Sequence, residues 1–472
     1  MLNRENRLKA HKFPWKITTL LYFISFGPVF AFSRNIYWDD WNMFDSRTGK
    51  IREGIYVGTG GGPWRTFFET EILRSSPLLF RIATFLCFYF AGYFLFRILS
   101  KIAFLSHVQI TAITLLFMVI PVNSARISLI TNGYALSYLL FFLAWFLFEE
   151  SDSTLATTTS FVAFFFSYSM ISFTTFTVLP ILLHIYISLQ NSKPRKWIFW
   201  VRLLLLTLLP IAYLTLRELF WPTTGVSAIM YQPQVRGLLR ALLFTGICST
   251  PLLYGLLVSK WSLSEVRKFI IPFGLFALSI GAFPYMVGGH LVDISDWLIA
   301  FIPNFSDWNS RHQLLLPLGI ALILGGSLKL DADKSFSWKS SPTLSIVIIF
   351  CVVLNVTFAQ EYFLDGKKQE AIMTEMETNE DLKNSSSILI DDTAIRFNGR
   401  GRLIRSYEWE DMLEKVFGDD YRKVTYLQYV NCEAFQPDAI LHISAPNGRL
   451  ESTLRRSVDI DLRVEKINPC GN

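Results

Sequence analysis

The stretch LLFRIATFLCFYFAGYFLFRIL, residues 78–99, decides the fold class of this chain. It is predominantly apolar and long enough to cross a bilayer core of about 30 Å as a helix. Such runs recur through the first three quarters of the chain and do not alternate as barrel strands do. They predict spans at about 17–36, 78–99, 108–122, 132–148, 155–170, 171–189, 197–215, 238–258, 269–287, 313–328 and 342–358.

Composition supports an α-helical polytopic membrane protein. The 472 residues are 51% hydrophobic and only 17% charged, whereas soluble domains carry about 25% charged residues. The net charge of +6 is small and spread out, and no basic stripe is present. Lys and Arg therefore serve topology rather than nucleic acid binding, and the expected surroundings are a lipid bilayer.

Basic residues mark one side of the predicted membrane. Met1–Lys16 holds five Lys and Arg residues, and further basic turns lie near Lys193, Lys260 and Lys329. With eleven spans, all of these fall on the cytoplasmic side, as the positive-inside rule requires. The long segment 34–77 and the C-terminal tail then lie outside the cytoplasm.

These assignments divide the chain into three parts. Residues 1–16 form a basic cytoplasmic N-terminus, and residues 17–358 form a membrane domain whose first extracytoplasmic loop is 34–77. Residues 359–472 form a small extracytoplasmic α/β domain. The run Ile17–Phe32 lacks a clear small-residue cleavage site, so we expect a retained signal anchor.

The tail shows its own secondary-structure pattern. Ser387–Ile390, Ala439–Ile443 and Val458–Val464 are predicted strands, and Tyr407–Phe417 has helical spacing. Two cysteines lie in this part of the chain. Outside the cytoplasm Cys432 and Cys470 form one disulfide, or they remain two unpaired thiols.

The first candidate site follows the first predicted span. Asp39 and Asp40 are adjacent carboxylates between aromatic residues, among them Trp41, which is a candidate substrate contact. Neighbouring carboxylates repel, which favours a shared proton or cation. The pair suits a general base or a divalent metal site, with Mg²⁺ or Mn²⁺ as cofactor. The alternative is a solvated helix end within an aromatic belt.

The rest of the first loop is a candidate binding segment. Its length of about 40 residues, without low complexity, is typical of functional loops. Arg65 and Glu69 lie here and are candidate substrate contacts. The glycines at 58–62 lack the Gly-Lys-Ser/Thr of a phosphate loop and indicate a hinge.

Three cationic or titratable residues lie at later predicted helix ends. Arg126 lies in a short outer turn at membrane depth, where charges are rare and tend to be functional. Arg311 and His312 begin the tenth span. A guanidinium suits phosphate, and imidazole can move protons near neutral pH. Snorkelling of these side chains to the interface is the alternative.

The order of these features resembles the GT-C superfamily of integral membrane glycosyltransferases. The resemblance rests on Asp39-Asp40 after the first span, Pro77-Leu78 at the second, and an Arg-containing outer turn with a fourth helix, which Arg126–Phe148 matches. It covers about residues 17–150, and the later spans only by topology. Tyr407-Glu408-Trp409 lies in a tail that looks like those of bacterial membrane proteins from surface polysaccharide loci.

The resemblance implies a glycosyltransferase of a bacterial cytoplasmic membrane. The acidic pair would act as base or hold a metal, and the donor would be a sugar linked to polyprenyl phosphate. The acceptor would be a glycan or a lipid. Two other functions stay open: a lipid-linked oligosaccharide flippase, and a non-catalytic scaffold of envelope polysaccharide assembly. A flippase needs polar residues near the bilayer midplane, and few are present.

Overall fold

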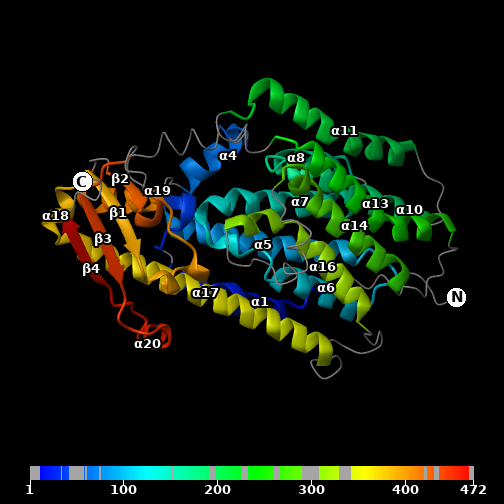
Figure 1. Ribbon diagram of the computed structural model, residues 1–472. Coiled ribbons are helices and arrows are strands. Elements are labelled where there is room, and N and C mark those ends of the chain that lie inside the picture. Colours follow the sequence, from blue (N-terminus) through cyan, green and yellow to red (C-terminus); the bar gives the residue numbers. More distant parts are fainter. Residues whose placement is uncertain are drawn as a thin grey trace.

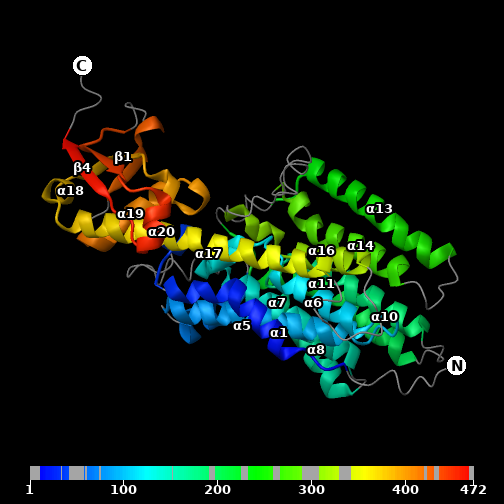
Figure 2. The ribbon, with the colours of Figure 1, turned by 90° about the horizontal axis from the view of Figure 1, so that it is seen from below.

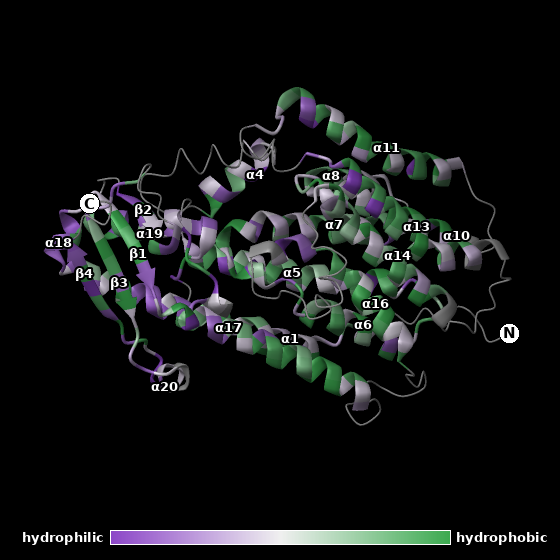
Figure 3. Ribbon diagram, in the orientation of Figure 1, coloured by the Kyte–Doolittle hydropathy of each residue, from purple (hydrophilic) through white to green (hydrophobic). Residues whose placement is uncertain are grey.

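The structure of the chain is a computed structural model. It describes residues 11–32, 34–41, 58, 61–73, 76–150, 153–190, 197–224, 232–258, 266–289, 308–328, 342–418, 422–429 and 435–466. These residues form a helical bundle and, at one end of it, a small sheet with three short helices (Figure 1). The bundle is predominantly hydrophobic, and hydrophilic residues are much more frequent around the sheet (Figure 3).

Six described helices are long and apolar enough to cross a membrane. This bears out a helical membrane protein, while the number eleven stays a prediction. The six are α5 (Pro77–Leu99), Leu129–Glu150, which includes α7 (Asn132–Glu150), α11 (Trp197–Phe220), Val235–Tyr254 within α13 (Val235–Val258), Phe269–Val287 within α14 (Val266–Val287), and α17 (Pro342–Glu377).

The remaining predicted spans coincide with shorter apolar helices. These are α1 (Trp15–Phe26) with the 3₁₀ turn η2 (Gly27–Phe32), α6 (His107–Val119), α8 (Thr154–Ser167), α9 (Ser172–Phe176) with α10 (Val178–Gln190), and α16 (Leu316–Ser327). Helix α6 is nearly all buried, from Val108 to Val119. It lies at the centre of the bundle, where short apolar helices are often found.

The segment after α1 contains short elements only. They are η3 (Trp38–Asp40), α4 (Pro63–Phe67) and the π-helical turn η4 (Phe68–Ile72). Two 3₁₀ turns, η5 (Ser124–Ile127) and η6 (Leu129–Thr131), connect α6 to α7. A third, η7 (Trp308–Gln313), precedes α16. We call residues 120–131 the α6–α7 turn.

The C-terminal unit, residues 380–466, is built on a four-stranded sheet of order β2-β1-β3-β4. Strand β1 (Ser387–Asp392) pairs in parallel with β2 (Lys423–Tyr426) and β3 (Ala439–Ser444), and β4 (Asp461–Lys466) is antiparallel to β3. Three helices belong to it, α18 (Glu380–Lys383), α19 (Ser406–Phe417) and α20 (Arg449–Arg455), with 3₁₀ turns η8 (Ile395–Phe397), η9 (Gly399–Gly401) and η10 (Leu427–Tyr429).

The core of this unit includes part of the bundle's longest helix. Ile388 and Leu441 on the sheet pack with Trp409 of α19 and with Ile372 of α17. Both ribbon views show that α17 runs beside α1 and extends as far as the sheet (Figure 2). The domain boundary predicted at residues 358 and 359 therefore lies inside one continuous helix.

Most of the strands and helices predicted in the tail are present in the structure. Strands β1 and β3 and helix α19 lie where the sequence pattern placed them, and β4 begins three residues later than predicted. Strand β2 was not predicted, because four residues are too few to show alternation. Cys432 and Cys470 lie outside the described residues, as does most of the first loop.

A buried ion pair fixes the C-terminal unit to α17. Lys368 is fully buried, and its Nζ donates to Asp392 Oδ2 at 2.6 Å, to Asn398 Oδ1 at 2.7 Å and to the Ala394 carbonyl at 3.1 Å. Asp392 ends strand β1. The amine thus joins the helix that leaves the bundle to the central strand of the sheet.

We predict that Lys368→Met destabilises the C-terminal unit by about 3 to 5 kcal/mol, because the carboxylate of Asp392 stays buried without its partner. Lys367→Met is the matched control, since Lys367 pairs with Glu370 on the exposed side of the same helix turn and such pairs contribute little. Limited proteolysis of the purified full chain over a temperature series measures both. Equal protection of the two variants would contradict the prediction.

Candidate functional site

Asp40 is buried against the start of α7. Its Oδ1 accepts hydrogen bonds from the Ser128 hydroxyl at 2.6 Å and the Ile130 N–H at 2.9 Å, and its Oδ2 accepts from the Leu129 N–H at 2.8 Å. The side chain is 0% exposed. Helix starts leave N–H groups without partners, and a carboxylate there also suits the helix dipole. Asp40 therefore caps the helical segment that begins at Leu129.

Burial governs the titration of this carboxyl. Desolvation raises the pKa of Asp40 to about 6, although the three hydrogen bonds and the nearby Arg81 guanidinium lower it. The carboxyl group is thus mainly ionised at neutral pH, and the ionised form is the one that the three hydrogen bonds stabilise.

Asp39 points away from Asp40, toward the C-terminal unit. Its Oδ1 accepts a hydrogen bond from the Tyr407 hydroxyl at 2.6 Å. The side chain is half-buried, and among the described residues its Oδ2 accepts no hydrogen bond. Adjacent in sequence, the two carboxylates have different surroundings, and Asp39 is the one that a substrate can reach.

The predicted shared metal ion fits this arrangement poorly. Both oxygens of Asp40 already accept hydrogen bonds from N–H and O–H donors. In the part of the chain that the structure describes, no three His, Cys, Asp or Glu residues are grouped to hold a metal ion.

Trp41 lies in a hydrophobic core. It is 3% exposed and belongs to the cluster of Ile372 and Trp409. The Lys415 amine lies 5.3 Å from its ring centroid. Its surroundings are those of a packing residue, which joins the segment after α1 to the C-terminal unit.

Arg65 and Glu69 form a buried ion pair with each other. Arg65 Nε lies 3.1 Å from Glu69 Oε1, and Glu69 is 0% exposed. Their segment lies against the first turn of α7, because a side chain at Gly133 would collide with the Arg65 guanidinium. The Tyr134 ring centroid is 5.8 Å from that guanidinium.

Arg311 and His312 lie on the other side of the α6–α7 turn. Ser310, which precedes them, accepts a hydrogen bond from the Ala125 N–H at 2.8 Å, and its hydroxyl lies 3.2 Å from that of Ser124. Arg311 and His312 are both buried. The His312 ring packs on that of Tyr285 at 5.3 Å between centroids.

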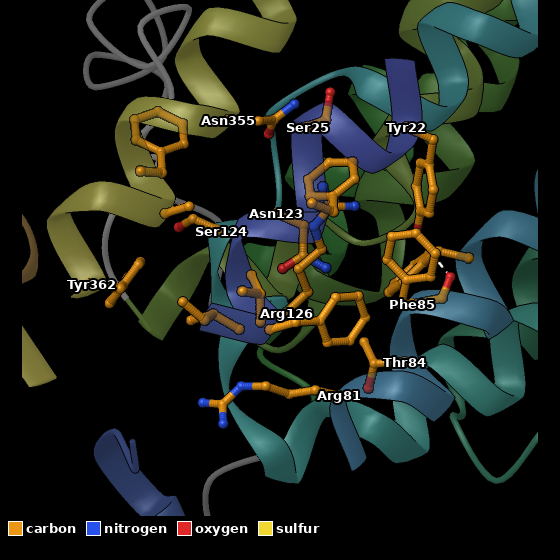
Figure 4. A pocket seen from close by; sticks show the side chains of 17 residues that line it. Tyr22, Ser25, Arg81, Thr84, Phe85, Asn123, Ser124, Arg126, Asn355 and Tyr362 are labelled. Carbon is orange, nitrogen blue, oxygen red and sulfur yellow. Dashed lines mark hydrogen bonds between the residues drawn. The ribbon is translucent and has the colours of Figure 1, made fainter. Parts of the chain in front are cut away.

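Arg126 lines a cavity between the end of α1, the first half of α5 and the middle of α17 (Figure 4). Its guanidinium lies over the Phe26 ring, and the Phe88 centroid is 5.7 Å away. The cavity holds about 60 Å³, several times what one water needs. Its lining is mostly apolar and comprises Tyr22, Ser25, Phe26, Val29, Phe30, Arg81, Thr84, Phe85, Phe88, Asn123, Ser124, Arg126, Ile127, Asn355, Phe358, Ala359 and Tyr362.

No acidic side chain among the described residues balances the charge of Arg126. Burial lowers the pKa of its guanidinium, and the nearby groups that oppose this shift are the phenols of Tyr22 and Tyr138. Among the described residues it makes no ion pair, and its guanidinium lies against aromatic rings that line the cavity. An arginine stays charged even when buried, so this cavity favours an anion.

Arg81 is a site residue that the sequence analysis missed. It is 4% exposed, lines the same cavity and donates to the Asn35 carbonyl at 2.7 Å. It lies within electrostatic range of Asp40. An arginine four residues after Pro77, inside an otherwise apolar run, was the available signal.

Several of the predicted site residues therefore lie around the α6–α7 turn and the start of α7, whereas Asp39 and Trp41 contact the C-terminal unit. Asp40 contacts residues 128–130, Arg65 contacts residue 133, Ser310 holds η7 against residues 124 and 125, and Arg126 belongs to the turn itself. Figure 4 shows Arg126 between Tyr22 on one side and Tyr362 on the other.

Comparison with known proteins adds little. No known protein family matches this sequence, and no curated protein sequence matches it. Among solved structures, arabinofuranosyltransferase AftD from Mycobacteria matches with 12% identity and a TM-score of 0.32. The match covers 90% of this chain and 32% of that protein's chain. A TM-score this low does not establish a common fold.

We predict that Asp40→Ala destabilises the protein by at least about 2 kcal/mol, because each buried donor left without an acceptor costs about 1 to 3 kcal/mol. Asp39→Ala is the matched control, since it leaves one hydroxyl unpaired at a half-buried position. Thermal unfolding of both purified variants tests this difference. Similar melting temperatures for the two would show that Asp40 does not hold the α7 start in place.

Proposed function

We propose that this chain is a membrane glycosyltransferase. It would transfer a sugar from a polyprenyl-phosphate donor to a glycan or lipid acceptor on the extracytoplasmic face of a bacterial cytoplasmic membrane. The observation that carries the proposal is the cavity around Arg126, a half-buried cation that has no acidic partner among the described residues and lies between apolar walls. The second chemical group is the half-buried carboxylate of Asp39. This residue follows Trp38, whose ring packs on that of Tyr362 in the cavity lining.

The walls of the cavity suit a lipid-linked anion. Phe30 and Phe85 in its lining are half-buried. Their neighbours Phe23, Ile82 and Leu86 are exposed apolar residues on α1 and α5. A phosphate held by Arg126 would thus have an isoprenoid chain leaving over hydrocarbon-like surface, which a free sugar phosphate could not use.

The proposed reaction needs one base and one cation. Asp39 would accept the proton of an acceptor hydroxyl, whose oxygen attacks the anomeric carbon of the donor sugar. The bond between that carbon and the phosphate oxygen breaks, and polyprenyl phosphate leaves. Arg126 would stabilise the negative charge that develops on the leaving phosphate.

Arg311 is the second proposed phosphate contact. Its 3₁₀ turn is held against Ser124 and Ala125, one residue from Arg126, through Ser310. His312 would fix this turn through its packing on Tyr285 rather than touch the substrate. Arg65 and Glu69 satisfy each other's charge, so we propose for them a supporting role beside the start of α7.

The first test replaces the proposed base. We expect Asp39→Asn to lower the turnover of a polyprenyl-phosphate sugar by at least about 100-fold, because general base catalysis contributes that much or more. Binding of polyprenyl phosphate and the melting temperature should stay at wild-type values. Full turnover by Asp39→Asn would refute the proposed role of this residue as the base. No sugar transfer by the wild type would favour the scaffold, and lipid translocation in liposomes without sugar transfer would favour a flippase.

The second test concerns the cation. We expect Arg126→Gln, in nanodiscs, to bind a short-chain polyprenyl phosphate at least about 10-fold more weakly, because hydrogen bonds to charged groups contribute about 1.5 to 3 kcal/mol. Arg97→Gln is the matched control, since Arg97 lies near the other end of α5 and pairs with Glu150. Inorganic phosphate serves as the comparison ligand, and we expect it to bind both proteins weakly. Unchanged binding of the lipid phosphate by Arg126→Gln contradicts the proposal.

A further inference from the structure

The C-terminal unit contacts the segment that carries the proposed base. The Tyr407 hydroxyl donates to Asp39 Oδ1 at 2.6 Å, and the next residue, Glu408, accepts a hydrogen bond from the Trp38 N–H through Oε2 at 3.1 Å. Two consecutive residues at the start of α19 thus hold two consecutive residues after α1. More than 360 positions separate the two pairs in the chain.

Tyr407 is held as a hydrogen-bond donor. Burial, and after it the neighbouring Asp39 carboxylate, raise the pKa of the Tyr407 phenol above its ordinary value. The phenol is thus held in its protonated form, in which it donates to the Asp39 carboxylate.

Glu408 fixes the position from which Tyr407 reaches Asp39. Its side chain is 0% exposed, and its Oε1 accepts from the Arg405 N–H at 2.9 Å, which closes the first turn of α19. Arg402 Nη1 donates to both oxygens of Glu408, at 2.7 and 3.0 Å, and Arg402 Nε donates to Asp365 Oδ2 at 3.0 Å. Because Asp365 lies in α17, this network ties α19 to the helix that enters the bundle.

Trp38 provides an independent sign that this segment is held in place. Its φ is +53°, in a region that residues other than glycine seldom adopt. Such strain persists where the surroundings over-determine the backbone. Here Glu408 holds the N–H, the Tyr362 ring packs at 5.3 Å and the Arg402 guanidinium lies 5.4 Å from the indole centroid. The turn at Trp38 is followed by Asp39 and Asp40, whose carboxylates bond to different partners.

We propose that Tyr407 is a positioning residue for Asp39, and that the C-terminal unit therefore completes the transferase site. This inference rests on the proposed function. One carboxylate oxygen of Asp39 is held by Tyr407, and the other stays available to the acceptor hydroxyl. The hydrogen bond also stabilises the ionised carboxylate, which is the form that accepts a proton.

The test compares Tyr407→Phe with Tyr429→Phe in the full-length protein in nanodiscs. Tyr429 belongs to the same unit and is 66% exposed. It lies in η10, whereas Tyr407, which contacts Asp39, lies in α19. For Tyr407→Phe we expect kcat to fall roughly tenfold while KM for the polyprenyl-phosphate sugar is unchanged. A drop in kcat without a change in KM is expected of a residue that orients the base and does not bind the donor. Tyr429→Phe should match the wild type in both constants.

Each outcome separates the two proposals. A wild-type kcat for Tyr407→Phe, in a preparation whose wild type is active, overturns the positioning role and leaves the transferase function standing. A lower melting temperature with kcat unchanged in the folded fraction shows a merely structural contact and also overturns it. Absence of transfer by the wild type overturns the proposed function, and the positioning role fails with it.

Discussion

The three hydrogen bonds that Asp40 accepts from residues 128–130 are the constraint on which the rest of the site depends. They join the segment after α1 to the start of α7 in a buried place, where a carboxylate without donors would be very costly. Trp38 and Asp39 directly precede Asp40 in the chain, so these hydrogen bonds also restrict where the backbone of these two residues can lie. The α6–α7 turn, which carries Arg126, is fixed by the same bonds.

The choice of neutral donors for Asp40 has a consequence for the cations nearby. Had the buried carboxylate been paired directly with Arg126, neither charge would remain for a ligand. Asp40 is instead satisfied by two N–H groups and one hydroxyl. Arg126 keeps its charge in an aromatic cavity, where a low dielectric strengthens its attraction for an anion. Because Asp40 caps the helical segment and bonds to neutral donors, Arg126 has no acidic partner among the described residues and its charge remains for a ligand.

Sequence alone could identify most of the candidate residues but not their roles. Apolar runs place the helices, because lipid requires continuous hydrophobic segments. Asp39, Asp40 and Arg126 stand out because charges beside such runs are rare. Which carboxylate is buried depends on residues 128–130, about 90 positions away, and no local pattern encodes this. Trp41 resembles an interfacial aromatic by position, yet it packs beside Trp409 in a core that forms only when the chain folds.

The longest helix shows why the C-terminal unit differs from a flexibly attached tail. A helix of 36 residues is about 54 Å long, and about 20 residues suffice to cross a bilayer. Its last turns carry Asp365 and Lys368, both fully buried in contacts with the unit. Such charges do not belong in lipid, so one rigid helix is both a membrane span and a core element of the sheet. A scaffold that only recruits partners needs no such continuity, whereas a catalytic carboxylate held across two parts of the chain requires it. The rigid path from α17 through Asp365, Arg402 and Glu408 to Trp38 therefore favours a shared site over an independent tail.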